Sequence, residues 1–239
     1  MPRDPEPELP HRSASDIAPG VVTGISARRR ERGRFLIAID GAPAFTLGEE
    51  TLTRAGLQRG DQLDTSAVAK LLAEDDAARA TEAALHFLSY RARSEHEVRD
   101  RLKRGDFSPE AIEATIVRLH EWRYLDDADF ARRWVENRAR QRPRGGRLLQ
   151  QELRNKGIDA ETSREAIAEA ELDEVAAATE LARKRLTTAG EDDPVAVKRR
   201  VSAYLARRGY GFETVRAALE RATGEALDED SDGDSEHSS

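Results

Sequence analysis

One short pattern recurs three times in the chain, and it limits the possible folds more than any other feature. Each copy has a leucine, four positions later a residue suited to ending a helix, then an apolar residue and, three positions further on, a glutamate. The copies begin at Leu102, Leu153 and Leu205, which are 51 and 52 residues apart. Such a spacing is typical of tandem repeats built from one supersecondary unit. Since each unit is long enough for three helices, the sequence predicts three stacked three-helix units.

The residue expected to end the helix is glycine in two of the copies, Gly157 and Gly209, and aspartate in the first, Asp106. This position commonly needs a left-handed backbone, which glycine adopts without steric strain. Because aspartate tolerates that conformation less well, we expect the adjacent Gly105 to take the role in the first copy.

Helical spacing of the apolar residues runs from about residue 65 to residue 224. Ser94 and Glu97 have the spacing of a capping box, and Ser108-Pro109 and Asp193-Pro194 are typical helix starts. The predicted fold is therefore mainly α. Three tandem three-helix repeats are expected to form an elongated body, with the repeats at residues 65–126, 127–174 and 175–224.

Residues 19–64 have a different pattern, because their apolar residues are β-branched or aromatic and come in short runs. Asp40-Gly41 lies between two of these runs and is a strong hairpin signal. We predict a small antiparallel β module of three strands, closed by a short helix at 48–57 and a turn at Gly60-Asp61.

Both ends of the chain have compositions typical of disorder. Residues 1–18 contain four of the nine prolines, and residues 225–239 contain seven acids with no lysine or arginine. We therefore predict a disordered N-terminus at 1–18 and a disordered acidic tail at 225–239.

The distribution of charge predicts an anionic partner. The formal net charge is −7, and the seven acids of the tail account for all of it. Within the neutral remainder, residues 131–150 carry seven arginines and a single acid, Glu136. Arginine offers a fork of donors that fits phosphate or carboxylate, and Gly145-Gly146 add the free N–H groups of a helix start. The candidate contact residues of this segment are Arg132, Arg133, Arg138, Arg140, Arg142, Arg144 and Arg147.

Further basic positions extend this candidate surface. In the third repeat they are Lys184, Arg185, Lys198, Arg199 and Arg200, with Arg207-Arg208 beyond them. In the β module, the tip of a hairpin is expected to carry Arg28, Arg29, Arg30, Arg32 and Arg34. For each group the alternative is a solvated face or loop with no partner.

No residue pattern favours catalysis. Asp126, Asp127 and Asp129 suggest a magnesium site, but the first two are also suited to capping a helix and the third to its first turn. The chain has no cysteine, and its five histidines have no metal-ligand spacing. Trp122, Phe130 and Trp134 have the spacing of core residues. We expect a protein without catalytic residues, metal or cofactor.

Four short stretches of the sequence together resemble the RecX family of regulators of the RecA recombinase. They are Ser94 to Val98, Tyr124 to Ala131, Gly145 to Arg147 and Glu152 to Ile158, in that order. Residues 34–61 also resemble the β segment of the longer members. Asp106, where the family usually has glycine, and the acidic tail depart from the family pattern.

This resemblance implies that the three repeats form a curved, elongated body. It also implies a non-enzymatic regulator in DNA repair, homologous recombination and the SOS response. Such a protein binds the RecA filament on single-stranded DNA and inhibits ATP hydrolysis, strand exchange and filament extension. We expect a cytoplasmic monomer without membrane contact, in which the arginines meet acidic protein surface, DNA phosphate or both. Two alternatives stay open, a stand-alone nucleic-acid-binding protein that competes for DNA and a magnesium-dependent enzyme that uses Asp126, Asp127 and Asp129. The tail is either solvated or a competitor of DNA for the arginines.

Overall fold

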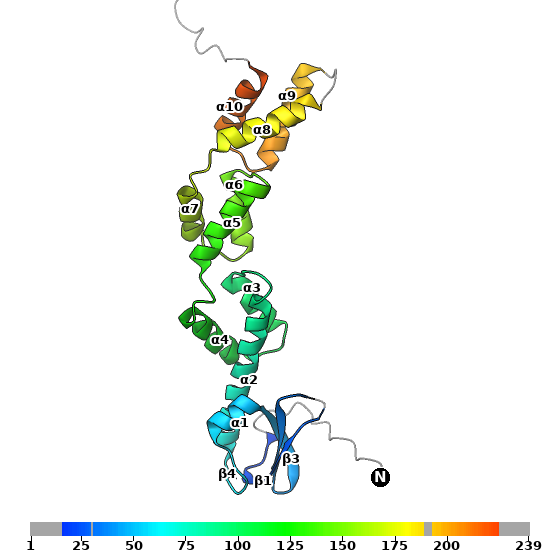
Figure 1. Ribbon diagram of the computed structural model, residues 1–239, viewed down its shortest axis with the longest axis vertical. Helices are drawn as coiled ribbons and strands as arrows, with labels where there is room; N and C mark the ends of the chain where they lie inside the picture. Colours follow the sequence, from blue (N-terminus) through cyan, green and yellow to red (C-terminus); the bar gives the residue numbers. More distant parts are fainter. Residues whose placement is uncertain (1–15, 30, 189–192, 225–239) are drawn as a thin grey trace, which may run out of the picture. The chain divides into compact units, whose positions relative to one another are not determined.

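The structure is a computed structural model that describes residues 16–29, 31–188 and 193–224. The expected disordered ends fall largely outside this range, as do Arg30 and the acidic tail. The chain divides into two compact units, Met1–Asp126 and Asp127–Ser239. The first unit contains a sheet and four helices and the second contains six helices within the described residues, labelled in Figure 1.

The first unit begins with an antiparallel sheet of four strands, where three were expected. Its order is β3-β2-β1-β4, formed by β1 (Gly20–Ala27), β2 (Arg34–Ile39), β3 (Ala42–Gly48) and β4 (Gln62–Leu63). Asp40 and Gly41 both have positive φ, at 50° and 84°, as a tight hairpin turn between β2 and β3 requires. The two-residue β4 is too short to show an alternating pattern, so no local signal indicates it.

Helix α1 (Glu49–Ala55) and the long helix α2 (Thr65–Leu88) complete this module. Its core includes the fully buried Ile37, Leu47 and Val68. Ile17 also lies in the core, only 4% exposed, so our prediction of disorder extending to residue 18 was wrong at this position. An apolar side chain that fills a gap beside the sheet is ordered by that contact, whatever the composition around it.

A buried ion pair joins α2 to the sheet. Asp75 on α2 is 3% exposed, and its carboxylate accepts a hydrogen bond from Arg34 Nη1 at 2.6 Å and one from the Gly48 N–H at 2.6 Å. Arg34 also donates to the carbonyl oxygen and hydroxyl of Thr46, at 3.1 and 2.7 Å. Arg34 is thus the first residue of β2 and holds the module together, which corrects its expected place at a hairpin tip.

The first three-helix repeat consists of α2, α3 (Glu95–Lys103) and α4 (Pro109–Glu121). Ser94 and Glu97 form the expected capping box, and Ser108 caps α4 ahead of Pro109. The core of the repeat includes Ala84, Val98, Leu102, Ile116 and Leu119.

The second unit holds two more repeats in sequence. One consists of α5 (Asp127–Gln141), α6 (Gly146–Asn155) and α7 (Ala160–Glu169), and the other of α8 (Glu174–Thr187), α9 (Pro194–Arg207) and α10 (Phe212–Thr223). Each has its own buried cluster, around Leu149 and Leu153 in one and around Val201 and Leu205 in the other. Three tandem three-helix repeats after an antiparallel sheet are the architecture that the recurring pattern and the N-terminal runs predict.

All three copies of the recurring pattern end a helix in the same way. Asp106, Gly157 and Gly209 have φ values of 56°, 80° and 89°. The next N–H, of Phe107, Ile158 or Tyr210, donates to the carbonyl of the leucine five residues earlier at 3.5, 3.0 and 3.3 Å. This is the Schellman motif, and each of the three leucines is fully buried. The prediction that Gly105 replaces Asp106 was wrong, because the hydrogen-bond register places the left-handed residue at 106.

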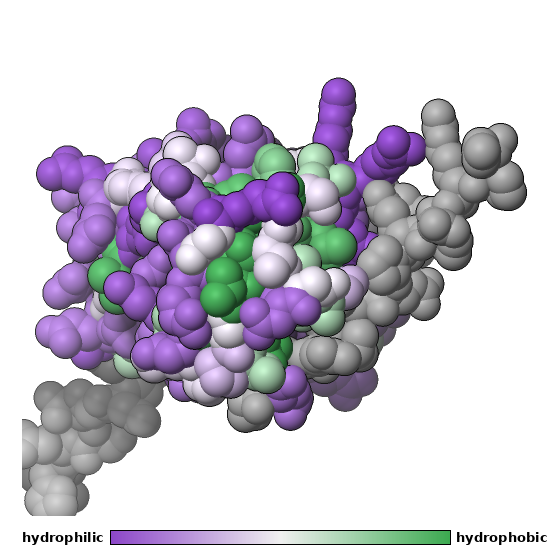
Figure 2. Space-filling model, turned by 90° about the horizontal axis from the view of Figure 1, so that it is seen from below, coloured by the Kyte–Doolittle hydropathy of each residue, from purple (hydrophilic) through white to green (hydrophobic). Residues whose placement is uncertain are grey.

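Hydrophilic residues dominate the end of the molecule shown in Figure 2, with apolar residues exposed only in small areas between them. This agrees with the 36% of charged residues in the sequence. Among the described helices, none combines the length and the apolar character needed to cross a membrane.

Candidate anion-binding surface

Three of the predicted arginines pair with acids of their own helix. On α5, Arg133 Nε lies 2.9 Å from an Asp129 oxygen, Arg132 lies 3.6 Å from the other oxygen, and Arg140 lies 3.0 Å from Glu136. All five side chains are more than a third exposed. These pairs are ordinary solvated helix contacts, and each leaves the arginine accessible from outside.

Two further arginines converge on one carboxylate, that of Glu152 on α6. Arg138 Nε and the Trp134 indole N–H both donate to it at 2.9 Å, and Arg144 forms an ion pair with it. The Arg138 guanidinium also lies 4.2 Å from the centre of the Trp134 ring. The Glu152 side chain is only 12% exposed. Glu152 therefore orders Arg138 and Arg144 at the junction of α5 and α6.

Arg208 joins this group from the third repeat. Its guanidinium donates to the Pro143 carbonyl at 3.2 Å and lies 5.0 Å from the centre of the Tyr204 ring. We call Arg138, Arg142, Arg144 and Arg208 the arginine cluster. Burial lowers the pKa of Arg144, and the positive charges of Arg138, Arg208 and Arg142 lower it further.

The cluster has more positive charge than its surroundings neutralise. Of its four guanidinium groups, those of Arg138 and Arg144 pair with Glu152, whereas Arg142 and Arg208 have no ionic partner among the described residues. Arg147, at the start of α6, is exposed and has no such partner in that part of the chain either. Like charges held together in this way favour a bound anion, because it relieves their mutual repulsion.

The helix start at Gly145-Gly146, by contrast, is not an open anion site. The Gly145 N–H donates to the Arg208 carbonyl at 2.9 Å, and the Gly146 N–H donates to the Glu174 carboxylate at 2.7 Å. The prediction that these amides are free for a phosphate was wrong. The chain itself supplies the anion, from the first turn of α8, so these two amides are already occupied and only side chains are left to bind another anion here.

The basic residues of the third repeat lie on two neighbouring helices. Lys184 and Arg185 are exposed in the last turn of α8, and Arg199 and Arg200 are exposed on α9, where Lys198 is half-buried. Arg185 also packs over the ring of Tyr204, 4.2 Å from its centre. Tyr204 thus touches both Arg185 and Arg208 and links these helices to the arginine cluster.

Only some of the arginines of the β module lie exposed at the hairpin tip where the sequence predicted them. Arg28 is paired with Glu31 at 2.9 Å, and its side chain is only 14% exposed. Arg29 and Arg32 are exposed in the connection between β1 and β2. Arg30 lies outside the described residues, and Arg34 is held by the buried carboxylate of Asp75.

The acids at the start of α5 do not come together as a group of three metal-ligating side chains in the part of the chain that the structure describes. Asp127 and Asp129 lie in the first turn of this helix, and Asp129 pairs with arginines. No group of three acidic or histidine side chains within the described ranges has a geometry that fits a metal ion.

The aromatic residues differ in part from expectation. Phe130 is buried and Trp134 is half-buried beside it, but Trp122 is 50% exposed. Helix α4 ends at Glu121, so the helical spacing that predicted a core position no longer applies at residue 122.

The sequence did not point to Glu152 or Trp134 as parts of the site, and it marked Arg208 only as a possible extension. The signal for Arg208 is its place just before the glycine of the third recurring pattern. Glu152 contacts Arg138 and Trp134, which lie 14 and 18 positions away on another helix, so no local spacing in the sequence predicts these contacts.

Fold and site together define a helical-repeat protein with a basic surface on its second and third repeats. Models of the first, second and third RecX three-helix domains match residues 80–119, 126–167 and 172–219. The chain belongs to the RecX family.

Known relatives agree with this assignment over most of the chain. The regulatory protein RecX of Bacillus velezensis is 33% identical over 87% of this chain and 80% of its own length. The Bacillus subtilis protein of that name is 32% identical over 84% and 76%. A crystal structure of a regulatory protein RecX superposes with a TM-score of 0.67 at 26% identity, over 82% of this chain and 97% of the other.

Proposed function

We propose that this protein regulates a RecA recombinase by binding its filament on single-stranded DNA. It lowers ATP hydrolysis, strand exchange and filament extension, and performs no chemistry of its own. Membership of the RecX family supports the regulatory role, and the arginine cluster supports contact with an anionic partner. The single observation that carries this proposal is the excess of four guanidinium groups over one carboxylate where two repeats meet.

The test removes Arg142 and Arg147, two exposed arginines of this segment that have no ionic partner among the described residues. Arg142→Gln with Arg147→Gln lowers the charge by two without disturbing Glu152. We expect this variant to need at least five-fold more protein for half-maximal inhibition of RecA ATP hydrolysis on single-stranded DNA. The control is Arg164→Gln with Arg216→Gln, which removes the same charge from α7 and α10 and should change the dose less than two-fold.

Two outcomes would count against the proposal. If the unmodified protein has no effect on ATP hydrolysis by the filament, the regulatory mechanism is wrong. If both double variants inhibit at the same dose as the unmodified protein, Arg142 and Arg147 are not contact residues.

The same cluster would also serve a stand-alone nucleic-acid-binding protein that only competes for DNA. Binding of this kind weakens steeply with salt, with a slope near −0.7 per phosphate on single strands, and needs no recombinase. We expect tighter binding to the assembled filament than to bare DNA of the same length. Equal affinities, measured by fluorescence anisotropy in one buffer, would favour the competitor.

A further inference from the structure

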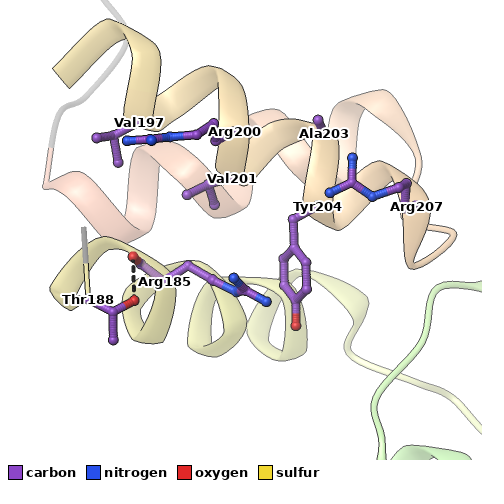
Figure 3. A pocket seen from close by; sticks show the side chains of 8 residues that line it. All are labelled: Arg185, Thr188, Val197, Arg200, Val201, Ala203, Tyr204 and Arg207. Carbon is purple, nitrogen blue, oxygen red and sulfur yellow. Dashed lines mark hydrogen bonds between the residues drawn. The ribbon is translucent and has the colours of Figure 1, made fainter. Parts of the chain in front are cut away.

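The third repeat contains a groove between α8 and α9 that the proposed function does not yet use. It has a volume of about 460 Å³, and Figure 3 shows the side chains that line it. They include Arg185 of α8 and Val197, Arg200, Val201, Tyr204 and Arg207 of α9. Val197 and Val201 are 5% and 4% exposed and form an apolar floor.

The walls of this groove are positively charged. Among the described residues that line it, three are arginines and none is acidic. Arg185 and Arg207 have no carboxylate partner among the residues that the structure describes. The groove therefore offers two uncompensated guanidinium groups to an anion, and each can form the paired hydrogen bonds that a phosphate accepts.

An aromatic ring lies between these charges. Tyr204 projects from α9 toward α8, and the guanidinium of Arg185 lies beside it, 4.2 Å from the ring centre (Figure 3). Flat aromatic and guanidinium groups of this kind are the surfaces on which proteins stack unpaired bases.

The groups follow one another along the helix. Arg200, Tyr204 and Arg207 have the i, i+4, i+7 spacing of a single helix face, and seven residues of helix span about 10.5 Å. Successive groups of an extended chain can thus meet alternating charged and aromatic positions. The guanidinium of Arg208 also lies 5.0 Å from the centre of the Tyr204 ring, so this ring contacts both the groove and a residue of the arginine cluster.

We propose that this groove binds single-stranded DNA directly. Arg185 and Arg207 hold phosphates, and a base packs against Tyr204 and the valine floor. The carboxylates of an acidic peptide would pair with the arginines but leave the tyrosine ring unused, whereas a nucleotide engages all three kinds of surface. This inference rests on the proposed function. It names single-stranded DNA as the component of the RecA–DNA filament that the third repeat contacts.

The decisive measurement uses the full-length protein and bare DNA. Binding of a fluorescently labelled oligothymidylate is followed by anisotropy for Arg185→Gln with Arg207→Gln and for a matched control, Arg183→Gln with Arg221→Gln. The control removes the same charge from α8 and α10 of the same repeat, at exposed positions outside the groove. We expect at least ten-fold weaker binding for the groove variant and less than two-fold for the control. Because the groove variant would bind two fewer phosphates, the slope of log affinity against log salt should shrink by about 1.4.

A second variant tests the stacking contact separately. Tyr204→Leu keeps an apolar side chain of similar size and all charges, so it should weaken binding about five-fold or more while leaving the salt slope unchanged. Circular dichroism of each variant shows whether the helices are intact.

Each result points in one direction. Equal losses in groove variant and control would show that only diffuse charge attracts DNA, and the groove site would be refuted. Normal DNA binding with lost inhibition of the filament would refute it too, because the groove would then contact protein. If instead the groove variant alone loses DNA binding but the unmodified protein does not affect RecA, the groove stands and the proposed function fails.

Discussion

Tyr210 shows how a single residue of the recurring pattern is affected by its surroundings. Its side chain is 2% exposed, and its hydroxyl has no hydrogen-bond partner among the described residues. Burial, with the nearby carboxylate of Glu174, raises its pKa to about 12 from an ordinary value of 10.0. The folded protein therefore keeps this proton at a pH where the unfolded chain has already lost it.

This shift predicts a dependence of stability on pH. The raised pKa contributes stability fully below pH 10, and the contribution is lost as the pH rises from about 10 to about 12. Urea denaturation at pH 9, 10 and 11 should show a smaller decline for Tyr210→Phe than for the unmodified protein. Tyr124→Phe is the control, because Tyr124 is 56% exposed. A decline that is the same in all three proteins would contradict the prediction.

Asp106 and Gly157 occupy equivalent positions with left-handed backbones, at φ of 56° and 80°, and both are exposed. Because glycine tolerates this conformation better, we expect Asp106→Gly to raise the free energy of unfolding by about 0.5–1 kcal/mol. Gly157→Asp should lower it by a similar amount. Chemical denaturation measures both, and a loss of stability in Asp106→Gly would show that the aspartate side chain makes a stabilising contact of its own.

At the scale of elements, the second and third repeats meet through backbone. A Cβ atom added to Gly145 would lie 2.4 Å from the carbonyl carbon and oxygen of Gly209 and 2.5 Å from the Tyr210 nitrogen. The start of α6 therefore packs directly against the turn that ends α9. The turn that ends α9 in the third repeat is therefore also the surface that the second repeat contacts.

This close approach makes Gly145→Ala a test of the junction. We expect the variant to lose about 1–3 kcal/mol of stability, because the backbone of two elements must move apart. Gly211→Ala is a matched control, since both glycines precede a helix with an extended backbone and Gly211 has no atom within 4 Å of an added Cβ. Equal denaturation midpoints for the two variants would show that the junction tolerates the extra atom.

At the scale of the whole molecule, the two units have separate cores. The clusters of the second unit, around Leu153 and Leu205, are built from residues after 126, and those of the first unit are built from residues before it. We expect residues 127–224 to fold alone, because their apolar contacts and the Gly145 junction lie within this fragment. A cooperative urea transition followed by circular dichroism would confirm this, and a helical but non-cooperative fragment would contradict it.

The net charge of the whole protein also differs in sign from the local charge at the arginine cluster. The chain is acidic overall, yet only two of the four guanidinium groups of the arginine cluster pair with a carboxylate among the described residues. A partner would meet this local charge, since fields at a surface depend mainly on groups within about 10 Å at ordinary salt.

The amino-acid sequence by itself determined the helices, their caps and two of the three Schellman turns, those at Gly157 and Gly209, whereas it indicated Gly105 instead of Asp106 for the first. These features depend on residues within about six positions of each other, so a local pattern contains the information they need. The Asp40-Gly41 hairpin and the basic segment at 131–150 were predictable for the same reason.

Only the tertiary structure decided which charges meet. Arg208 reaches Pro143 across 65 positions, Asp75 reaches Arg34 across 41, and Glu174 fills the helix start at Gly146 across 28. Such contacts follow from how the helices pack, and packing depends on the shape of whole buried surfaces. For this reason the sequence could indicate a basic protein surface, but the arrangement of its repeats separates the arginines held by acids from those available to a partner.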